Sequence, residues 1–360
     1  MPVDTGELLR RLSEATGISG YETEVRTVVS EACGPYADEV RQDKMGSVIA
    51  LKRGAGPEPR LAIMLAAHLD EIGLIVTQVK DGFLQFGTVG GFDPRVLLGQ
   101  SVTVLGRDPL PGIIGSRPPH VLPAAEREKV IPIEQLYVDV GLPAEEVGRL
   151  VNVGDLMVMR QKFTRLRGDL ATGKAMDDRA GVASLIICLE ELTRLRHSWD
   201  VLAVATAQEE VGLKGAAASA FGLAPDLAIV VDVGFGNQPG VSESETVPMG
   251  KGPTIGFGPN IHPPMFARLI EVAKTREIPY LIEAVPGQSG TDAWAIQVTR
   301  EGIPTCLLSI PTRYMHTPVE TVCLKDVTRT GRLMAAFISG LDDEFLKDIA
   351  WPLPAKSNEF

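Results

Sequence analysis

The stretch LAIMLAAHLD at residues 61–70 combines an apolar run with a polar end. Residues 61–67 are all apolar, a length and composition typical of a buried strand. His68 follows this run directly, and Asp70 comes two residues later. A histidine can bind a metal ion, and a nearby carboxylate can hold its ring in the orientation that binding requires. The stretch therefore predicts a strand that ends in a metal site.

Three further apolar runs end in residues of the same chemical types. They are residues 201–207 before Glu209 and Glu210, residues 227–231 before Asp232, and residues 303–310 before His316. The carboxyl ends of parallel strands lie at one edge of a sheet, where ligands bind. Adjacent buried carboxylates are costly unless a cation neutralises them. We therefore predict a metal centre at the edge where these strands end.

The rest of the chain fits an α/β fold with an insertion. From residue 180 onward, helical and strand patterns alternate, which predicts a mixed, largely parallel sheet sandwiched by helices. Between residues 71 and 165 the pattern changes to short strands separated by glycine and proline. We therefore predict a discontinuous α/β domain at residues 1–70 and 166–350, an inserted small β domain at 71–165, and a tail at 351–360.

Composition excludes several classes of function. Of the 360 residues, 44% are hydrophobic and 22% are charged, which is ordinary for a soluble folded protein. The net charge of -11 disfavours nucleic acids and membranes as partners, because no basic stripe is available to neutralise phosphates. The amino terminus lacks the features of a secretory signal, and the four cysteines form no Cys-x-x-Cys pair. We expect a cytoplasmic protein that acts on small molecules or peptides.

Two adjacent aspartates, Asp177 and Asp178, precede a long amphipathic helix. Acids at this position can simply cap a helix and complement its dipole. Together with the other candidate ligands, they also complete an inventory for two divalent ions. Such a centre needs a bridging carboxylate, a carboxylate and an imidazole for each ion, and an uncommitted base. A nitrogen and oxygen set without thiolate suits zinc, cobalt or manganese.

Six motifs occur in order along nearly the whole chain. They are AHLDEIG at residues 67–73, GKAMDDR at 173–179, QEEVG at 208–212, VD at 231–232, GTDA at 290–293 and PTRYMHTP at 311–318. Together the motifs resemble those of the tetrahedral aminopeptidase family of dinuclear metallopeptidases. That family includes glutamyl, deblocking and lysyl aminopeptidases, and its members are often labelled cellulase or endoglucanase M.

The resemblance implies a role for each candidate residue. Asp177 would bridge two divalent ions, and the peptide bond after it would be cis. The other ligands would be His68 and Asp232 for one ion, and Glu210 and His316 for the second. Glu209 would be the general base that takes a proton from water and passes it to the leaving amine. Asp70 would hold the ring of His68 by its far nitrogen.

The resemblance also implies an architecture and partners. A zinc-peptidase-like catalytic domain would be interrupted by a β-barrel or PDZ-like domain, in agreement with the insertion at residues 71–165. The inserted domain would serve oligomerisation and access to the active site. The substrates would be peptides, and copies of the same chain would form dimers and then a hollow tetrahedral dodecamer.

Several residues are candidates for substrate binding. They are Thr291, Asp292, Trp294, Arg313, Tyr314 and His120. Trp294 is bulkier than the family pattern leads us to expect, and it either packs as a core or interface aromatic or narrows the pocket for the first substrate side chain. A preference for acidic substrates would need a cation such as Arg313 or Lys251. His120 is either a plain surface residue or one that reaches a neighbouring subunit's active site.

Three other functions compete with an aminopeptidase. Paired carboxylates also serve glycosidases, although 5% aromatic residues offers few stacking platforms for sugars. A deacylase or dipeptidase would share the dinuclear centre. A non-catalytic metal-binding scaffold would share it too, but would have no need of Glu209 as an unligated base. Hydrolysis of amino-terminal peptide bonds is our leading prediction.

Overall fold

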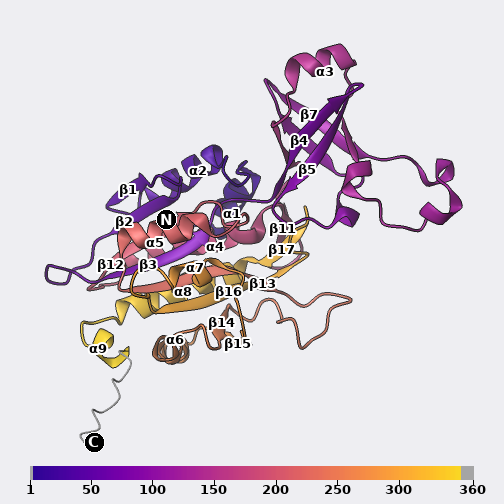
Figure 1. The fold of residues 1–360 in the computed structure, drawn as a ribbon. Helices are drawn as coiled ribbons and strands as arrows, with labels where there is room; N and C mark the ends of the chain where they lie inside the picture. Colours follow the sequence, from indigo (N-terminus) through magenta and orange to yellow (C-terminus); the bar gives the residue numbers. More distant parts are fainter. Residues whose placement is uncertain (1–2, 350–360) are drawn as a thin grey trace, which may run out of the picture.

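The predicted apolar runs form the centre of one large sheet in the computed structural model, which describes residues 3–349. Its strands are β1 Glu39–Gln42, β2 Val48–Lys52, β3 Ala62–His68, β10 Thr164–Arg165, β11 Leu170–Gly173, β12 Asp200–Thr206, β13 Leu227–Phe235, β14 Thr254–Phe257, β15 Leu281–Ala284, β16 Thr305–Arg313 and β17 Glu320–Cys323. They follow the order β1-β2-β12-β3-β13-β16-β17-β11-β10, and β14 and β15 extend from β16 (Figure 1).

The four central strands β12, β3, β13 and β16 run parallel to one another. Thr206 pairs with His68 between β12 and β3, and Asp232 pairs with Ser309 between β13 and β16. The central strands are buried along nearly their whole length, as expected for parallel strands covered on both faces. Strands β1, β2, β17, β11 and β10 pair antiparallel with their neighbours, whereas β15 pairs parallel with β14. The prediction of a mixed sheet is therefore confirmed.

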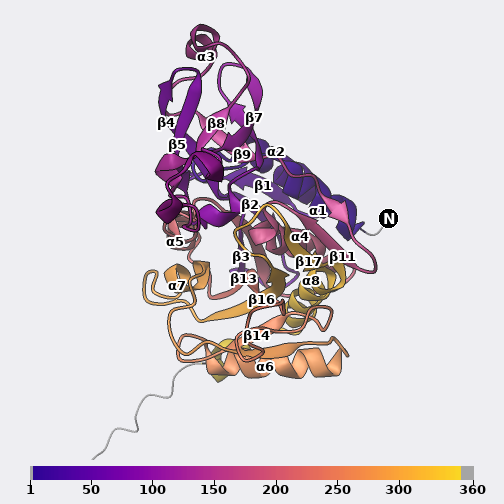
Figure 2. The same cartoon turned by 90° about the vertical axis from the view of Figure 1, so that its right-hand side faces the viewer.

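Helices cover both faces of this sheet. They are α1 Thr5–Glu14, α2 Thr23–Cys33, α4 Met176–Leu192, α5 Lys214–Leu223, α6 Pro263–Thr275, α7 Asp292–Ile296, α8 Leu324–Ser339 and α9 Phe345–Ile349. Figure 2 shows α5 and α7 on one side of the sheet and α4 and α8 on the other. Because α4 packs between the central strands and α8, it is buried along almost its full length. The predicted sandwich is confirmed.

A closed barrel projects from the layered part of the molecule (Figure 1). Its strands are β4 Gly73–Lys80, β5 Phe83–Val89, β6 Ser101–Leu105, β7 Pro109–Gly115, β8 Tyr137–Asp139 and β9 Leu156–Met159, in the order β4-β5-β8-β7-β6-β9. The barrel has its own apolar core, and helix α3, Ala144–Leu150, lies at its tip. All six strands fall within the predicted range 71–165, whose limits and role in assembly stay predictions.

An arm leaves the barrel between β7 and β8. It holds the short 3-10 helices η2 Pro119–Val121, η3 Ala124–Glu126 and η4 Ile133–Gln135, and a further one, η1 Pro94–Val96, lies between β5 and β6.

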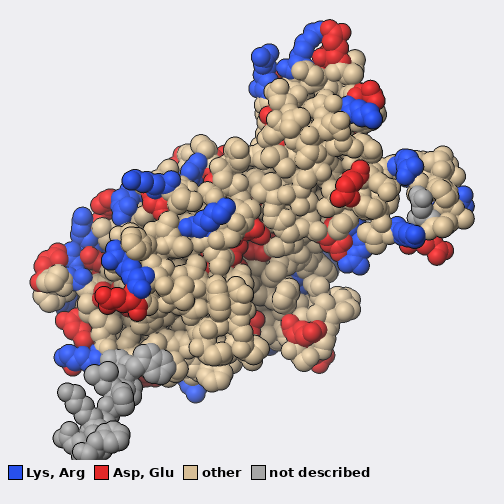
Figure 3. Space-filling view, in the orientation of Figure 1, with Lys and Arg blue, Asp and Glu red and all other residues tan. Residues whose placement is uncertain are grey.

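The surface carries charges of both signs. Figure 3 shows acidic and basic side chains interspersed over the face of the molecule seen in Figure 1, with no continuous basic stripe on that face. Among the helices at residues 3–349, none has the length and apolar character needed to cross a bilayer. The tail predicted at 351–360 lies outside the described residues.

Candidate active site

The five predicted metal ligands converge at the carboxyl ends of the central strands. His68 ends β3, Asp177 lies at the start of α4, Glu210 follows β12, Asp232 lies on β13 and His316 follows β16. All five line one cavity, which Glu209 also lines. The side chains of His68, Asp177, Asp232 and Glu210 are buried, whereas that of His316 is partly exposed. This cavity therefore contains the whole predicted ligand set.

The carboxylate of Asp177 lies between two imidazoles. Its Oδ1 is 2.9 Å from Nε2 of His68, and its Oδ2 is 3.4 Å from Nε2 of His316. The Nε2 atom of His316 is also 3.4 Å from Oε1 of Glu210. Burial opposes ionisation of Asp177, but hydrogen bonds from the two histidines hold its pKa well below its ordinary value. The peptide bond between Asp177 and Asp178 is cis, as the resemblance implied.

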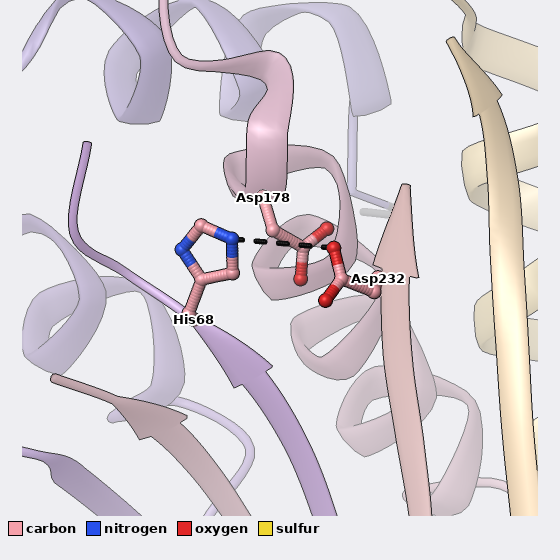
Figure 4. A group of neighbouring side chains, drawn as sticks. All are labelled: His68, Asp178 and Asp232. Atoms are coloured by element: carbon pink, nitrogen blue, oxygen red, sulfur yellow. Dashed lines mark ion pairs between the residues drawn. The ribbon is translucent and has the colours of Figure 1, made fainter. Parts of the chain in front are cut away.

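Two groups of side chains bring their oxygen and nitrogen atoms close enough to share an ion. One group is His68, Asp178 and Asp232, and the other is His68, Asp177 and Glu210, with all ligand atoms of a group within 4.8 Å of one another. Figure 4 shows the first group, with side chains from β3, α4 and β13 pointing toward one another. Nε2 of His68 lies 4.0 Å from Oδ1 of Asp232.

Asp178 has a structural contact as well. Its Oδ1 accepts a hydrogen bond of 3.0 Å from the backbone N–H of Gly181, so this aspartate caps the first turn of α4. Its Oδ2 is buried and has no hydrogen-bond partner within residues 3–349. Burial raises the pKa of both Asp178 and Asp232 well above the ordinary value, because their charged forms are poorly solvated.

The donor set fits divalent cations. Within residues 3–349, no lysine or arginine forms an ion pair with Asp177, Asp178, Asp232 or Glu210, and the ionic contacts of this cluster are with the two histidines. Buried carboxylates of this kind need a positive charge to balance them. Carboxylate oxygens with imidazole nitrogens, and no thiolate, suit zinc, cobalt or manganese.

Asp70 organises the ends of two strands. Its Oδ1 accepts a hydrogen bond of 3.0 Å from the backbone N–H of Glu209, and its Oδ2 accepts bonds from the N–H of Glu210, at 3.2 Å, and the hydroxyl of Ser19, at 2.6 Å. Nδ1 of His68 is 3.1 Å from the backbone carbonyl of Asp70 and 3.6 Å from its carboxylate. This fully buried aspartate thus fixes the imidazole and the two glutamates relative to one another.

Glu320, at the start of β17, is a site residue that the sequence reasoning missed. Its Oε2 accepts the backbone N–H of Asp177 at 3.1 Å, and its Oε1 accepts the N–H of His316 at 2.8 Å. Burial raises the pKa of this carboxyl group to about 8. One side chain therefore joins the backbones of two ligands from different elements. The available signal was weak: Glu320 is an acid at the start of a four-residue strand that ends in Val322 and Cys323.

A buried ion network lies beside the cluster, within motifs that the sequence had singled out. Nζ of Lys174 is 2.8 Å from both carboxylate oxygens of Glu71, and the Arg179 guanidinium is 3.7 Å from the same carboxylate. Glu71 also accepts the backbone N–H of Gly17 at 3.0 Å. Breaking a buried pair of this kind leaves an uncompensated charge, so the network holds β3, α4 and the amino-terminal segment together.

Comparison with known proteins agrees with this geometry. Residues 46–333 match the model of the family described as M42 glutamyl aminopeptidase. The chain belongs to that family. It is 37% identical over 343 residues to the lysyl aminopeptidase of Pyrococcus furiosus, an alignment that covers 93% of this chain and 97% of the relative. This M42 family member is therefore a peptidase of the aminopeptidase type.

Solved structures lead to the same family. A TET aminopeptidase from a marine sediment archaeon, Thaumarchaeota archaeon SCGC AB-539-E09, matches with a TM-score of 0.91 and 38% identity, over 96% of this chain and 99% of the other. The TET1 peptidase of Pyrococcus horikoshii, which can assemble into a tetrahedron or a large octahedral shell, matches with a TM-score of 0.82 and 32% identity, over 94% and 100%. The M42 aminopeptidase thus shares its complete fold with these structures.

The predicted substrate-binding residues of this aminopeptidase differ in whether they line the cavity. Thr291 lines the cavity, and its hydroxyl caps α7 by accepting the N–H of Ala293 at 3.3 Å. Asp292 is buried and accepts a hydrogen bond from Thr206, and burial raises its pKa to about 6. Trp294 is half-buried on α7 and is not among the cavity-lining residues described.

The other candidates of this M42 family member are not among the described residues that line the cavity. The guanidinium of Arg313 donates to the backbone and side chain of Asn237, so it secures a loop, and neither Arg313 nor Lys251 is among the described lining residues. Tyr314 is exposed next to that loop, and His120 is exposed on the arm of the barrel. Their roles in substrate binding stay predictions.

Proposed function

We propose that this aminopeptidase binds two divalent ions, zinc or cobalt, and removes amino-terminal residues from peptides. Asp177 would lie between the ions. His68 and Asp232, which share one group of mutually close ligand atoms, would hold one of them. Glu210 and His316, whose Oε1 and Nε2 atoms are 3.4 Å apart, would hold the other. The observation that carries the proposal is the position of the Asp177 carboxylate, with one oxygen facing each imidazole. Ions bound in this way polarise carbonyl groups and lower the pKa of water.

Glu209 is the proposed general base. Its side chain is buried at the cavity wall, and it belongs to neither group of mutually close ligand atoms. A carboxylate in this place accepts a proton from the attacking water and delivers it to the leaving amine. The hydrogen bond from the backbone N–H of Glu209 to Asp70 fixes the base beside the ligands.

The test uses p-nitroanilides of several amino acids, free and N-acetylated, with protein that has been chelated and then reloaded with Zn²⁺ or Co²⁺. We expect metal-dependent release from the free-amine substrates alone. Glu209→Gln should bind metal normally, as measured by elemental analysis, and lose about 10²- to 10⁴-fold in kcat. Glu146→Gln, on exposed α3, is the matched control and should keep full activity.

Other outcomes would point to other functions. Normal metal content and wild-type hydrolysis by Glu209→Gln would rule out its role as the base. Activity that survives chelation and acts on cellulose chains would favour a glycosidase. Cleavage of N-acetylated compounds or dipeptides alone would favour a deacylase or dipeptidase. Metal binding without hydrolysis of any substrate would favour a metal-binding scaffold.

Self-assembly is part of the same proposal. The TET1 peptidase is known as a dodecamer and can assemble into a tetrahedron or a large octahedral shell, and its structure matches 94% of this chain. We propose that this aminopeptidase also forms dimers that assemble into a dodecamer of twelve chains, which admits peptides.

We also propose that the protein is cytoplasmic. All four of its cysteines are free and buried, which supports a reducing compartment such as the cytoplasm.

A further inference from the structure

The cavity extends beyond the ligand cluster to another acidic side chain, Glu283 on β15. Strand register fixes its direction: Asp232 pairs with Ser309, and Ser309 pairs with Thr254. Thr254 pairs in turn with Leu281, two residues before Glu283. Paired residues, and residues two apart on a strand, point to the same face of a sheet. Asp232 and Glu283 therefore point to one face from strands separated by β16 and β14.

Gly234 keeps the space between these two carboxylates open. It lies two residues after Asp232 on the same face of β13. A β-carbon at this position would lie 3.0 Å from Cβ of Ser309 and 3.6 Å from Oε2 of Glu283. Since residues two apart on a strand are separated by about 7 Å, the Glu283 carboxylate lies within about 11 Å of the Asp232 β-carbon. The glycine thus leaves a short path from the ligand cluster to Glu283.

Glu283 is a half-buried carboxylate without a positive partner in the described part of the chain. Oε2 of Glu283 accepts a hydrogen bond of 2.6 Å from Oγ1 of Thr254, and no ion pair with a lysine or arginine forms within residues 3–349. The described lining of the cavity contains no lysine or arginine, while Leu307, Val285 and Met315 add apolar surface. An apolar wall with an unbalanced carboxylate fits a long aliphatic stem that ends in a positive charge.

We infer that Glu283 binds the positive end of a lysine or arginine side chain at the amino terminus of the substrate. The inference rests on the proposed function, because it places the scissile bond at the ligand cluster. The four-carbon stem of lysine suits the path past Gly234, and an arginine guanidinium can donate two hydrogen bonds to a carboxylate. Acidic amino-terminal side chains meet a like charge and are disfavoured. Specificity would then come from β15, a strand that carries no proposed metal ligand.

The first test compares kcat/KM for the p-nitroanilides of lysine, arginine, leucine and glutamate, using metal-loaded wild type and Glu283→Gln. We expect the wild type to prefer lysine and arginine. The variant should lose about tenfold to a hundredfold on these two substrates alone, the size of a hydrogen bond to a charged group. Glu146→Gln is again the control. A wild type that prefers leucine or glutamate, or a variant with an unchanged profile, would overturn the inference and leave the proposed function intact.

A binding measurement tests the proposed Glu283 subsite independently of the proposed reaction. Norleucine has the shape of lysine without its side-chain amine, so calorimetric titration with both amino acids isolates the contribution of the positive end. We expect the wild type to bind lysine more tightly than norleucine, and Glu283→Gln to bind them alike. If no p-nitroanilide is cleaved but this preference is present, the proposed reaction fails and the subsite stands. If the wild type binds both alike, the subsite is wrong whatever the activity.

Discussion

At the scale of single residues, Glu320 is the support whose loss we expect to be most informative. Its two carboxylate oxygens accept one backbone N–H each, from Asp177 and His316. An amide has one acceptor oxygen, so Glu320→Gln leaves one of the two donors facing an NH₂ group. Losses of such supporting groups typically reduce metal affinity about ten- to a hundredfold. We expect that loss in Glu320→Gln, measured by competition with a chelator, while the circular dichroism spectrum stays unchanged.

The same measurement has a matched control and a contradicting result. Glu146→Gln makes the identical chemical change at an exposed position and should bind metal as the wild type does. A Glu320→Gln protein with wild-type metal affinity and a lower melting temperature would show that Glu320 only stabilises the fold.

Residues at the ends of long strands could be predicted from the sequence, and residues on short strands could not. His68 and Asp232 follow apolar runs whose character is plain in the sequence, so the cavity that they line was expected. Glu320 and Glu283 lie on four-residue strands, where no periodicity is long enough to be recognised. Ser19 contacts Asp70 from a loop, and nothing local fixes where a loop lies.

At the scale of elements, the contact between α4 and α8 depends on Gly331. A β-carbon there would lie 2.6 Å from the backbone carbonyl of Ser184 and 2.8 Å from the side chain of Ile187. Glycine to alanine normally stabilises a helix by about 0.5–1 kcal/mol, but overpacking a core costs about 1–3 kcal/mol. We therefore expect Gly331→Ala to lower the free energy of unfolding in urea. Gly148→Ala on α3, where a β-carbon meets nothing within 4 Å, should raise it or leave it unchanged.

The strands that are buried on both faces of the sheet are the ones that the sequence predicted most closely. The runs at 61–67 and 201–207 correspond to β3 and β12, shifted by one residue. The short strands β10, β11, β14 and β17 were not predicted. Each has only two to four residues, and such strands are set by contacts with their neighbours in the sheet. Helix α3 was also missed within the barrel, since its seven residues carry little amphipathic signal.

At the scale of the whole molecule, the proposed dodecamer gives a direct prediction. Light scattering on the purified protein should give twelve times the mass of one chain, and deletion of residues 117–130 from the arm should reduce that mass without unfolding the barrel. Most described side chains in this segment are exposed, and the arm residues that pack against the barrel core, Ile131 and Ile133, stay in the variant. A wild-type protein of monomer mass at micromolar concentration would contradict the proposed assembly.

The place of the barrel in the chain also bears on how the active site is assembled. The barrel occupies the chain between β3 and α4, the two elements that bring His68 and Asp177 to within 2.9 Å of each other. That contact joins residues 109 positions apart, and contacts at such separation form slowly. Neighbouring strands of the barrel, such as β4 and β5, close much shorter loops. We expect the barrel to fold first and, through its paired first and last strands β4 and β9, to bring the ends of β3 and α4 together. The insertion would then assist folding of the site that it interrupts.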